Sequence, residues 1–145
     1  MSVPADFRRV LEANDADWAP GLPTKCQIVY GDHLDAKLQV YSMAEYDKVI
    51  ARIEAMPDSD PNKDHITHLM ITQSEPLVVD KDGRAVLPLK RREKLGLTEG
   101  GLSFRGRISH FEIWKAEDYD AEVSAPVQEF LSDKPKNFNP LSLVP

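Results

Sequence analysis

Hydrophobic residues recur along this chain with two different periods, and each period predicts one type of secondary structure. Apolar and polar residues alternate over residues 36–40 (AKLQV) and over residues 110–114 (HFEIW), which is typical of half-buried strands. Phe7, Val10 and Leu11 recur at spacings of three and four residues, which predicts a helix with one buried face. The pattern therefore favours a fold that mixes helices with strands.

Two further helices are predicted between these strands. Ser42 and Glu45 have the spacing of a capping box, which marks a helix start. Apolar residues then fall on one helical face: Tyr46, Val49, Ile50 and Ile53. A second helix should begin after Pro61 and end at Pro76, before a strand over residues 77–79. It should bury three apolar residues: Ile66, Leu69 and Met70.

Two parts of the chain resemble each other. Pro4 is followed by ADFRRVLE and Pro88 by LKRREKLG, while LQVYSMAEYD in the first half matches FEIWKAEDYD in the second. The matched positions are 84 residues apart at the prolines and 73 residues apart from Tyr46 to Tyr119, a drift that loop lengths explain. We therefore interpret the chain as α+β, with two diverged copies of one small β-rich unit joined by helices.

Composition narrows the class of protein. The chain has 145 residues, 41% hydrophobic and 29% charged, as in an ordinary folded domain. No run approaches the ~18–20 apolar residues of a membrane span, and the charged N-terminal segment lacks the apolar stretch of a signal peptide. The single cysteine, Cys26, favours a reducing compartment, expected to be the cytoplasm, and a place in the core.

The net charge of -6 conceals an uneven distribution. Residues 80–110 carry eight basic and four acidic residues, whereas the rest of the chain carries 10 basic and 20 acidic residues. An acidic protein with one basic face can attract a polyanion such as DNA. From charge alone, a solvated charged surface that binds no polyanion is an equally good explanation of this distribution.

Motifs for catalysis or metal binding are weak. Residues 58–69 begin like a calcium-binding loop, but Lys63 and Leu69 stand where that loop needs Gly and Glu. His65 and His68 have no soft third ligand nearby, so we interpret them as solvated or capping residues. We expect no catalysis, no metal, no cofactor and no small-molecule substrate.

The most informative segment is VVDKDGRAVLP, residues 78–88. Asp82-Gly83 between two β-rich runs predicts a hairpin with a type I′ turn, because Gly tolerates positive φ. Asp80 and Arg84 then flank the tip of a two-stranded ribbon, where the carboxylate should orient the guanidinium. Such an arginine can bond guanine O6 and N7 in the major groove. The alternative is a surface pair that only steadies the hairpin.

The segment VDKDGRAVLP, with GRISHFEIWKAEDYD downstream, closely resembles the MraZ transcriptional regulators, a family of the wider SpoVT/AbrB DNA-binding group. The resemblance covers residues 1–124 and implies two AbrB-like units of the swapped-hairpin or double-split β-α-β kind, each with a D-x-x-x-R element. The second copy holds this element at Asp80 and Arg84, whereas the first begins too late to contain it. This leads to the hypothesis that the protein extends upstream of Met1 by a strand and a hairpin.

The resemblance implies an organisation for the chain. The first unit, N-terminally incomplete, should span residues 1–47, the linking helices residues 48–76, and the second unit residues 77–120. A C-terminal arm over residues 121–145 should be irregular, because residues 125–145 hold four prolines.

The resemblance also implies a function. It is sequence-specific binding of double-stranded DNA at direct repeats upstream of the division and cell-wall gene cluster, and of the protein's own gene. The binding species would be a ring-shaped homo-oligomer associated with the nucleoid. The rival interpretation is an oligomeric assembly protein that has lost DNA reading with the first D-x-x-x-R hairpin.

Candidate contact residues follow from this interpretation. Arg84 should contact base or phosphate, with Asp80 orienting it, and Lys81 at the tip should contact phosphate, which positions a protein without reading sequence. Basic residues on the next helix are expected either to contact phosphate or to form its solvent face: Lys90, Arg91, Arg92 and Lys94. Arg105 and Arg107 are weaker candidates.

Overall fold

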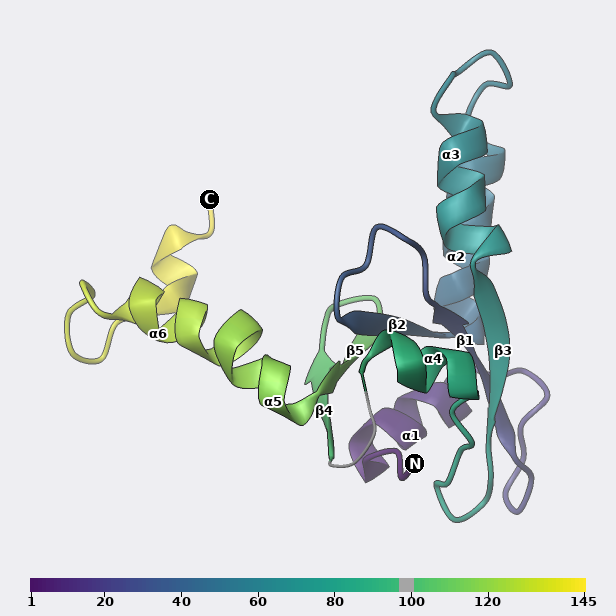
Figure 1. Ribbon diagram of the computed structural model, residues 1–145, viewed down its shortest axis with the longest axis horizontal. Helices are drawn as coiled ribbons and strands as arrows, with labels where there is room; N and C mark the ends of the chain where they lie inside the picture. The colour runs from purple at the N-terminus through teal and green to yellow at the C-terminus, as the bar shows by residue number, and fades with distance from the viewer. Residues whose placement is uncertain (97–100) are drawn as a thin grey trace.

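Five antiparallel strands form one sheet in the computed structural model, which describes residues 1–96 and 101–145 (Figure 1). The strands are β1 (Thr24–Val29), β2 (Lys37–Ser42), β3 (Ser74–Val79), β4 (Leu102–Gly106) and β5 (Phe111–Lys115). Their order across the sheet is β3-β1-β2-β5-β4. Strands from the two halves of the sequence therefore share one sheet, and the expected α+β class is confirmed.

Helices surround this sheet. In chain order they are α1 (Ala5–Ala13), α2 (Met43–Glu54), α3 (Lys63–Thr67), the π-helical η1 (His68–Thr72), α4 (Leu89–Lys94), α5 (Ala116–Tyr119), the π-helical η2 (Asp120–Ser124), α6 (Ala125–Leu131) and the 3-10 turn η3 (Pro140–Leu143). Figure 1 shows α2 and α3 as a helical hairpin on one side of the sheet, and α5 to α6 as an arm on the other. None of the helices in the described part of the chain has the length and apolar content needed to cross a membrane.

The two matched prolines adopt the same backbone conformation. Pro4 has φ -53 and ψ 142, and Pro88 has φ -55 and ψ 146. Each directly precedes a helix, α1 or α4, and follows a buried apolar residue, Val3 or Leu87. The similarity between the two parts of the sequence thus extends to local structure at these positions.

The core lies between the sheet and the elements that cover one of its faces, which are α1, Val3 before it, and the segment over residues 85–95. The residues of this cluster with no exposed surface come from the inner strands and β3: Cys26, Ile28, Leu38, Val40, Val79 and Ile113. The predicted place of Cys26 in the core is confirmed, and its thiol donates to the Leu77 carbonyl oxygen at 3.6 Å. Burial raises the pKa of Cys26 to about 12, so the thiol stays protonated and is unreactive.

The first turn of α2 forms as the sequence predicts. The Ser42 side chain accepts the backbone N–H of Glu45 at 3.2 Å. Tyr46 and Ile53 are buried, and Val49 and Ile50 are half-buried against the same cluster. The capping-box spacing and the helical period of the apolar residues therefore predicted the start and the buried face of α2 correctly.

Several sequence predictions are wrong in detail. Val10 is 55% exposed, because the inward face of α1 is limited to Phe7 and Leu11. Pro76 does not end a helix but lies within β3, opposite Gln27 of β1. β3 is an edge strand, where a missing backbone N–H costs no ladder bond if it faces outward.

The other differences concern the helices after residue 60. The helix expected after Pro61 is confirmed and begins at Lys63, but the three apolar residues predicted to be buried on it are only half-buried: Ile66, Leu69 and Met70. The C-terminal residues are not wholly irregular, since they contain α6 and η3.

A buried carboxylate lies on β5, between β2 and β4. Glu112 on β5 is 3% exposed, although the alternating pattern places it on a polar face. Lys37 Nζ lies 3.2 Å from its carboxylate, Arg105 Nη1 lies 3.6 Å away, and Trp114 Nε1 donates to it at 3.2 Å. Burial alone would raise the pKa of Glu112, but the Trp114 hydrogen bond and the charges of Lys37 and Arg105 lower it.

Replacement of Glu112 by Gln should lower the free energy of unfolding at pH 7 by about 2 to 3 kcal/mol, because two cations lose their partner. The lowered pKa means that ionised Glu112 stabilises the fold above the pKa of the unfolded chain, and that this contribution is lost as the pH falls through the folded pKa. Urea unfolding at pH 7 and in acid should show the gap between parent and variant shrinking. A gap independent of pH would contradict this role.

Candidate nucleic-acid interface

The loop after β3 is built by short-range hydrogen bonds. The N–H of Asp80 donates to the Arg84 carbonyl oxygen at 2.8 Å, and the N–H of Gly83 donates to the Asp80 carbonyl oxygen at 3.0 Å. Gly83 has φ +79, whereas Asp82 is not among the described residues with positive φ. The predicted type I′ turn is therefore wrong, because that turn needs positive φ at both central residues. The loop over residues 80–84 has three residues between Asp80 and Arg84, and the last of them, Gly83, is in the left-handed conformation.

The Asp80 carboxylate fixes the backbone of this loop. Its Oδ1 accepts the N–H of Asp82 at 2.8 Å and the N–H of Arg84 at 2.9 Å. The bond from the Arg84 N–H is the main reason that the pKa of Asp80 is lowered, and the Asp82 N–H and the charges of Arg84 and Arg8 add to it. The salt bridges found in residues 1–96 and 101–145 include none between Asp80 and Arg84. Asp80 thus orients the loop rather than the guanidinium, which corrects the sequence interpretation.

The segment that leaves the loop pairs with the N-terminal residues rather than with β3. Ser2 and Arg84 form an antiparallel bridge, in which the N–H of Val3 donates to the Gly83 carbonyl oxygen at 2.8 Å and the N–H of Ala85 to the Met1 carbonyl oxygen at 2.9 Å. The expected two-stranded ribbon is therefore wrong. The loop is held by β3 on one side and by the N-terminal residues on the other, and the Arg84 side chain is exposed.

Arg8 on α1 packs under the loop, and the sequence analysis missed it. A Cβ added at Gly83 would lie 2.7 Å from Arg8 Nη1, so a larger residue there would displace this guanidinium from its present position. Arg8 also lies 4.0 Å from Glu12, and 30% of its side chain is exposed. The internal similarity held a signal for it, because the 84-residue offset pairs Arg8 with the candidate Arg92.

Comparison with known proteins identifies the family. No family model matches the chain. It is 38% identical over 144 residues to the transcriptional regulator MraZ of Ruegeria sp. strain TM1040, covering 99% of this chain and 86% of that protein. It is 39% identical over 141 residues to MraZ of Ruegeria pomeroyi, with 97% and 84% covered, and 39% identical over 137 residues to MraZ of Cereibacter sphaeroides strain ATCC 17025, with 90% and 80% covered. The chain belongs to the MraZ family of transcriptional regulators.

The basic residues between positions 80 and 110 divide into exposed and engaged groups. Those with exposed side chains are Lys81, Arg84, Lys90, Arg92 and Arg107. Arg105 is engaged instead by Glu112 of the buried cluster.

Two basic residues of α4 hold this helix on the sheet. The Arg91 guanidinium carbon lies 3.1 Å from the centre of the Tyr30 ring, and its Nε donates to Glu75 at 2.9 Å. Lys94 Nζ donates to the carbonyl oxygens of Tyr30 and Gly31, both at 3.0 Å. Of the four basic residues expected on this helix, only Lys90 and Arg92 therefore present an exposed side chain.

Neighbouring arginines on α4 should respond differently to mutation. Arg91→Ala removes the contact with Tyr30 and the ion pair with Glu75, so the free energy of unfolding should fall by about 1 to 2 kcal/mol. Arg92→Ala, the matched control, should change it by less than about 0.5 kcal/mol, because its side chain is exposed. Denaturant unfolding measures both. Equal stability of the two variants would remove Arg91 from this packing role.

Proposed function

We propose that this chain is a sequence-specific DNA-binding regulator that acts through the loop formed by residues 80–84. Its sites would be direct repeats upstream of the division and cell-wall gene cluster and of its own gene. The observation that carries the proposal is an exposed Arg84 on a loop with a fixed backbone, in a member of a family of transcriptional regulators. We propose no catalytic step and no cofactor.

The construction of the loop suits DNA recognition. Because the Asp80 carboxylate and the bridge to Ser2 already order its backbone, DNA binding need not bear that entropic cost. Arg84 can then reach a guanine edge in the major groove, while Lys81 beside it contacts phosphate. Lys90 and Arg92 extend the cationic surface, whereas Arg91 serves the packing of α4.

Self-association belongs to the same proposal. One loop offers few contacts, so useful affinity requires several copies of the chain on neighbouring DNA repeats. We propose a ring-shaped homo-oligomer, located in the cytoplasm and associated with the nucleoid.

Replacement of Arg84 by Ala should weaken binding to the DNA upstream of the gene, with a loss of roughly 1–3 kcal/mol per guanine contact. Arg84→Lys keeps the charge but loses the bidentate geometry, so it should lose discrimination between repeats and mutated repeats more than total affinity. Lys48→Ala, which changes an exposed and ion-paired lysine of α2, is the control and should bind like the parent. Equal affinity of Arg84→Ala and the parent in a gel shift would remove Arg84 from the interface.

DNA fragments with several repeats should bind far more tightly than fragments with one, and binding should fall steeply with salt as counterions are released. Titration of both fragments at two salt concentrations measures these effects. An oligomer that binds neither fragment would support the rival function, assembly without DNA reading. A monomer that binds one repeat tightly would contradict the multivalent arrangement.

A further inference from the structure

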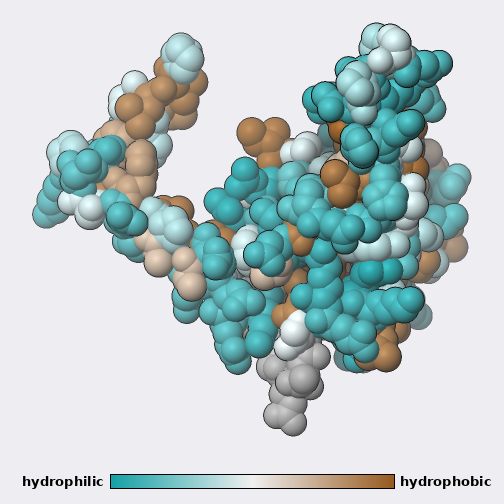
Figure 2. Space-filling model, turned by 45° about the horizontal axis from the view of Figure 1, so that its top comes forward, coloured by the Kyte–Doolittle hydropathy of each residue, from teal (hydrophilic) through white to brown (hydrophobic). Residues whose placement is uncertain are grey.

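The C-terminal arm, residues 121–145, exposes a row of apolar side chains. They are between 39% and 72% exposed: Val127, Phe130, Leu131, Leu141, Leu143 and Val144. The arm has an internal structure, since the rings of Phe130 and Phe138 meet edge to face at 6.2 Å and Lys134 Nζ lies over both. Figure 1 shows the arm projecting from the sheet, and Figure 2 shows apolar surface along it. An ordered segment with this much exposed apolar surface is typical of a protein interaction site.

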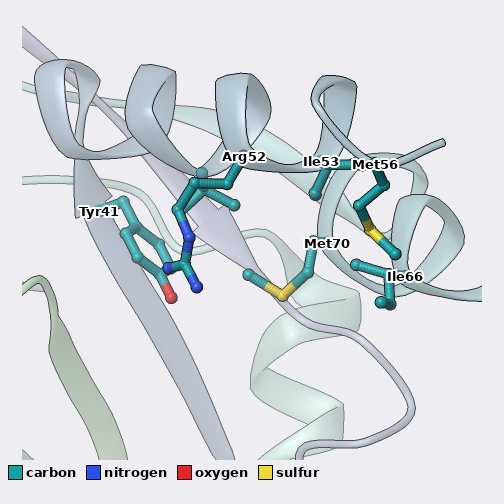
Figure 3. A pocket seen from close by; sticks show the side chains of 7 residues that line it. Tyr41, Arg52, Ile53, Met56, Ile66 and Met70 are labelled. Atoms are coloured by element: carbon teal, nitrogen blue, oxygen red, sulfur yellow. The ribbon is translucent and has the colours of Figure 1, made fainter. Parts of the chain in front are cut away.

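A complementary hollow lies on the helical hairpin of the same chain. It is an open groove of about 330 Å³ between α2 and the α3–η1 segment. Its lining is mostly apolar: Tyr41, Val49, Arg52, Ile53, Met56, Ile66 and Met70. Figure 3 shows Met56 and Ile66 at one end, the Arg52 guanidinium beside the Tyr41 ring at the other, and Met70 between them.

The groove is preformed by contacts beneath it. The Tyr46 hydroxyl donates to the Met70 carbonyl oxygen at 2.9 Å, which ties η1 to α2. Lys63 Nζ donates to the carbonyl oxygen of Met56 at 2.9 Å and pairs with Asp58 at 2.8 Å, which closes the turn between the helices. The half-buried state of Ile66 and Met70 therefore reflects an uncovered groove between fixed walls.

We propose that the C-terminal arm of one copy docks into the groove between α2 and α3–η1 of a neighbouring copy. The occupant is a second copy because arm and groove lie on opposite sides of the sheet, so the arm does not fill the groove of its own chain (Figure 1). Charge agrees with this docking. Glu129, beside Phe130 on the arm, and Arg52 at the groove are both exposed, and neither has a salt-bridge partner within the described residues.

The internal similarity indicates what type of symmetry the contact has. The 73-residue offset that pairs Tyr46 with Tyr119 aligns α2 with the segment from α5 into α6. The arm is thus the counterpart of the helical hairpin, at the other side of the molecule. A contact between two different surfaces is heterologous, and repetition of it closes a ring or extends a filament. The inference rests on the proposed self-association, but not on DNA binding.

Disulfide trapping between copies tests the contact. Val127→Cys places a thiol on the apolar face of α6, and Met56→Cys places one in the groove. Oxidation of an equal mixture, one variant carrying a size tag, should give mixed dimers, and the double variant should give a ladder of covalent oligomers. Ala125→Cys, on the opposite face of α6, is the matched control and should give no mixed dimer. The native Cys26 is fully buried and should not react.

The outcomes separate this proposal from the others. Dimers of Val127→Cys alone, with no mixed dimer, would show that arms pair with arms and would overturn docking in the groove. Light scattering adds a second readout, since Phe130→Asp should raise the dissociation constant between copies at least about tenfold while circular dichroism stays that of the parent. Arg52→Glu should weaken assembly and Glu129→Arg should restore it in the same chain.

Two further results would overturn the docking in different ways. Assembly of the parent and of Phe130→Asp to the same mass, without mixed dimers, overturns the arm contact and leaves the proposed oligomer standing. A parent chain that is monomeric at tens of micromolar overturns both. Loss of DNA binding in an assembled protein would bear on the proposed function alone.

Discussion

The pairing of β2 with β5 joins the two halves of the sequence into one sheet, and the rest of the structure depends on it. Leu38 lies opposite Ile113 and Val40 opposite Phe111, so four buried apolar residues meet across this seam. On one side β1 adds β3, and on the other β5 adds β4. Neither half could bury these strands alone, because each would leave an inner strand as an open edge. The ion cluster of Glu112 lies at the same seam and links β2, β4 and β5.

This arrangement decides where the candidate site can be. β3 lies in the second half of the sequence but pairs with β1 of the first half, so the loop that follows it lies next to α1 and the N-terminal residues. Arg8 can therefore pack under Gly83, and Met1 and Val3 can pair with the segment that contains Arg84. The loop is short, but both of its ends are held by parts of the chain that are distant in sequence. A fixed backbone with an exposed arginine is the result.

Features set by neighbouring residues were predictable from the sequence, and features set by distant partners were not. The cap at Ser42 and the prolines before two helices are local, and the structure has both. The position of the turn at Gly83 was predicted correctly, but its type was not. The expected two-stranded ribbon is replaced by pairing with residues 1–3. Arg91 looked like its neighbour Arg92, since no local pattern shows that Tyr30 lies beneath it. For the candidate site, position was therefore predictable and the division into exposed and engaged cations was not.

An acidic chain can present this site because its charges are separated in space. Six acidic residues lie on α5, η2 and the arm: Glu117, Asp118, Asp120, Glu122, Glu129 and Asp133. In Figure 1 this segment leaves the sheet on a different side from the loop between β3 and α4. Salt screens charge interactions over roughly 8 Å at physiological ionic strength, so an acidic segment placed away from the loop reduces the attraction of DNA there less than one beside it. Its negative charge also opposes non-specific contact of the arm with phosphates. These placements agree with the proposed docking of the arm on a second copy and with the proposed contact of Arg84 with DNA.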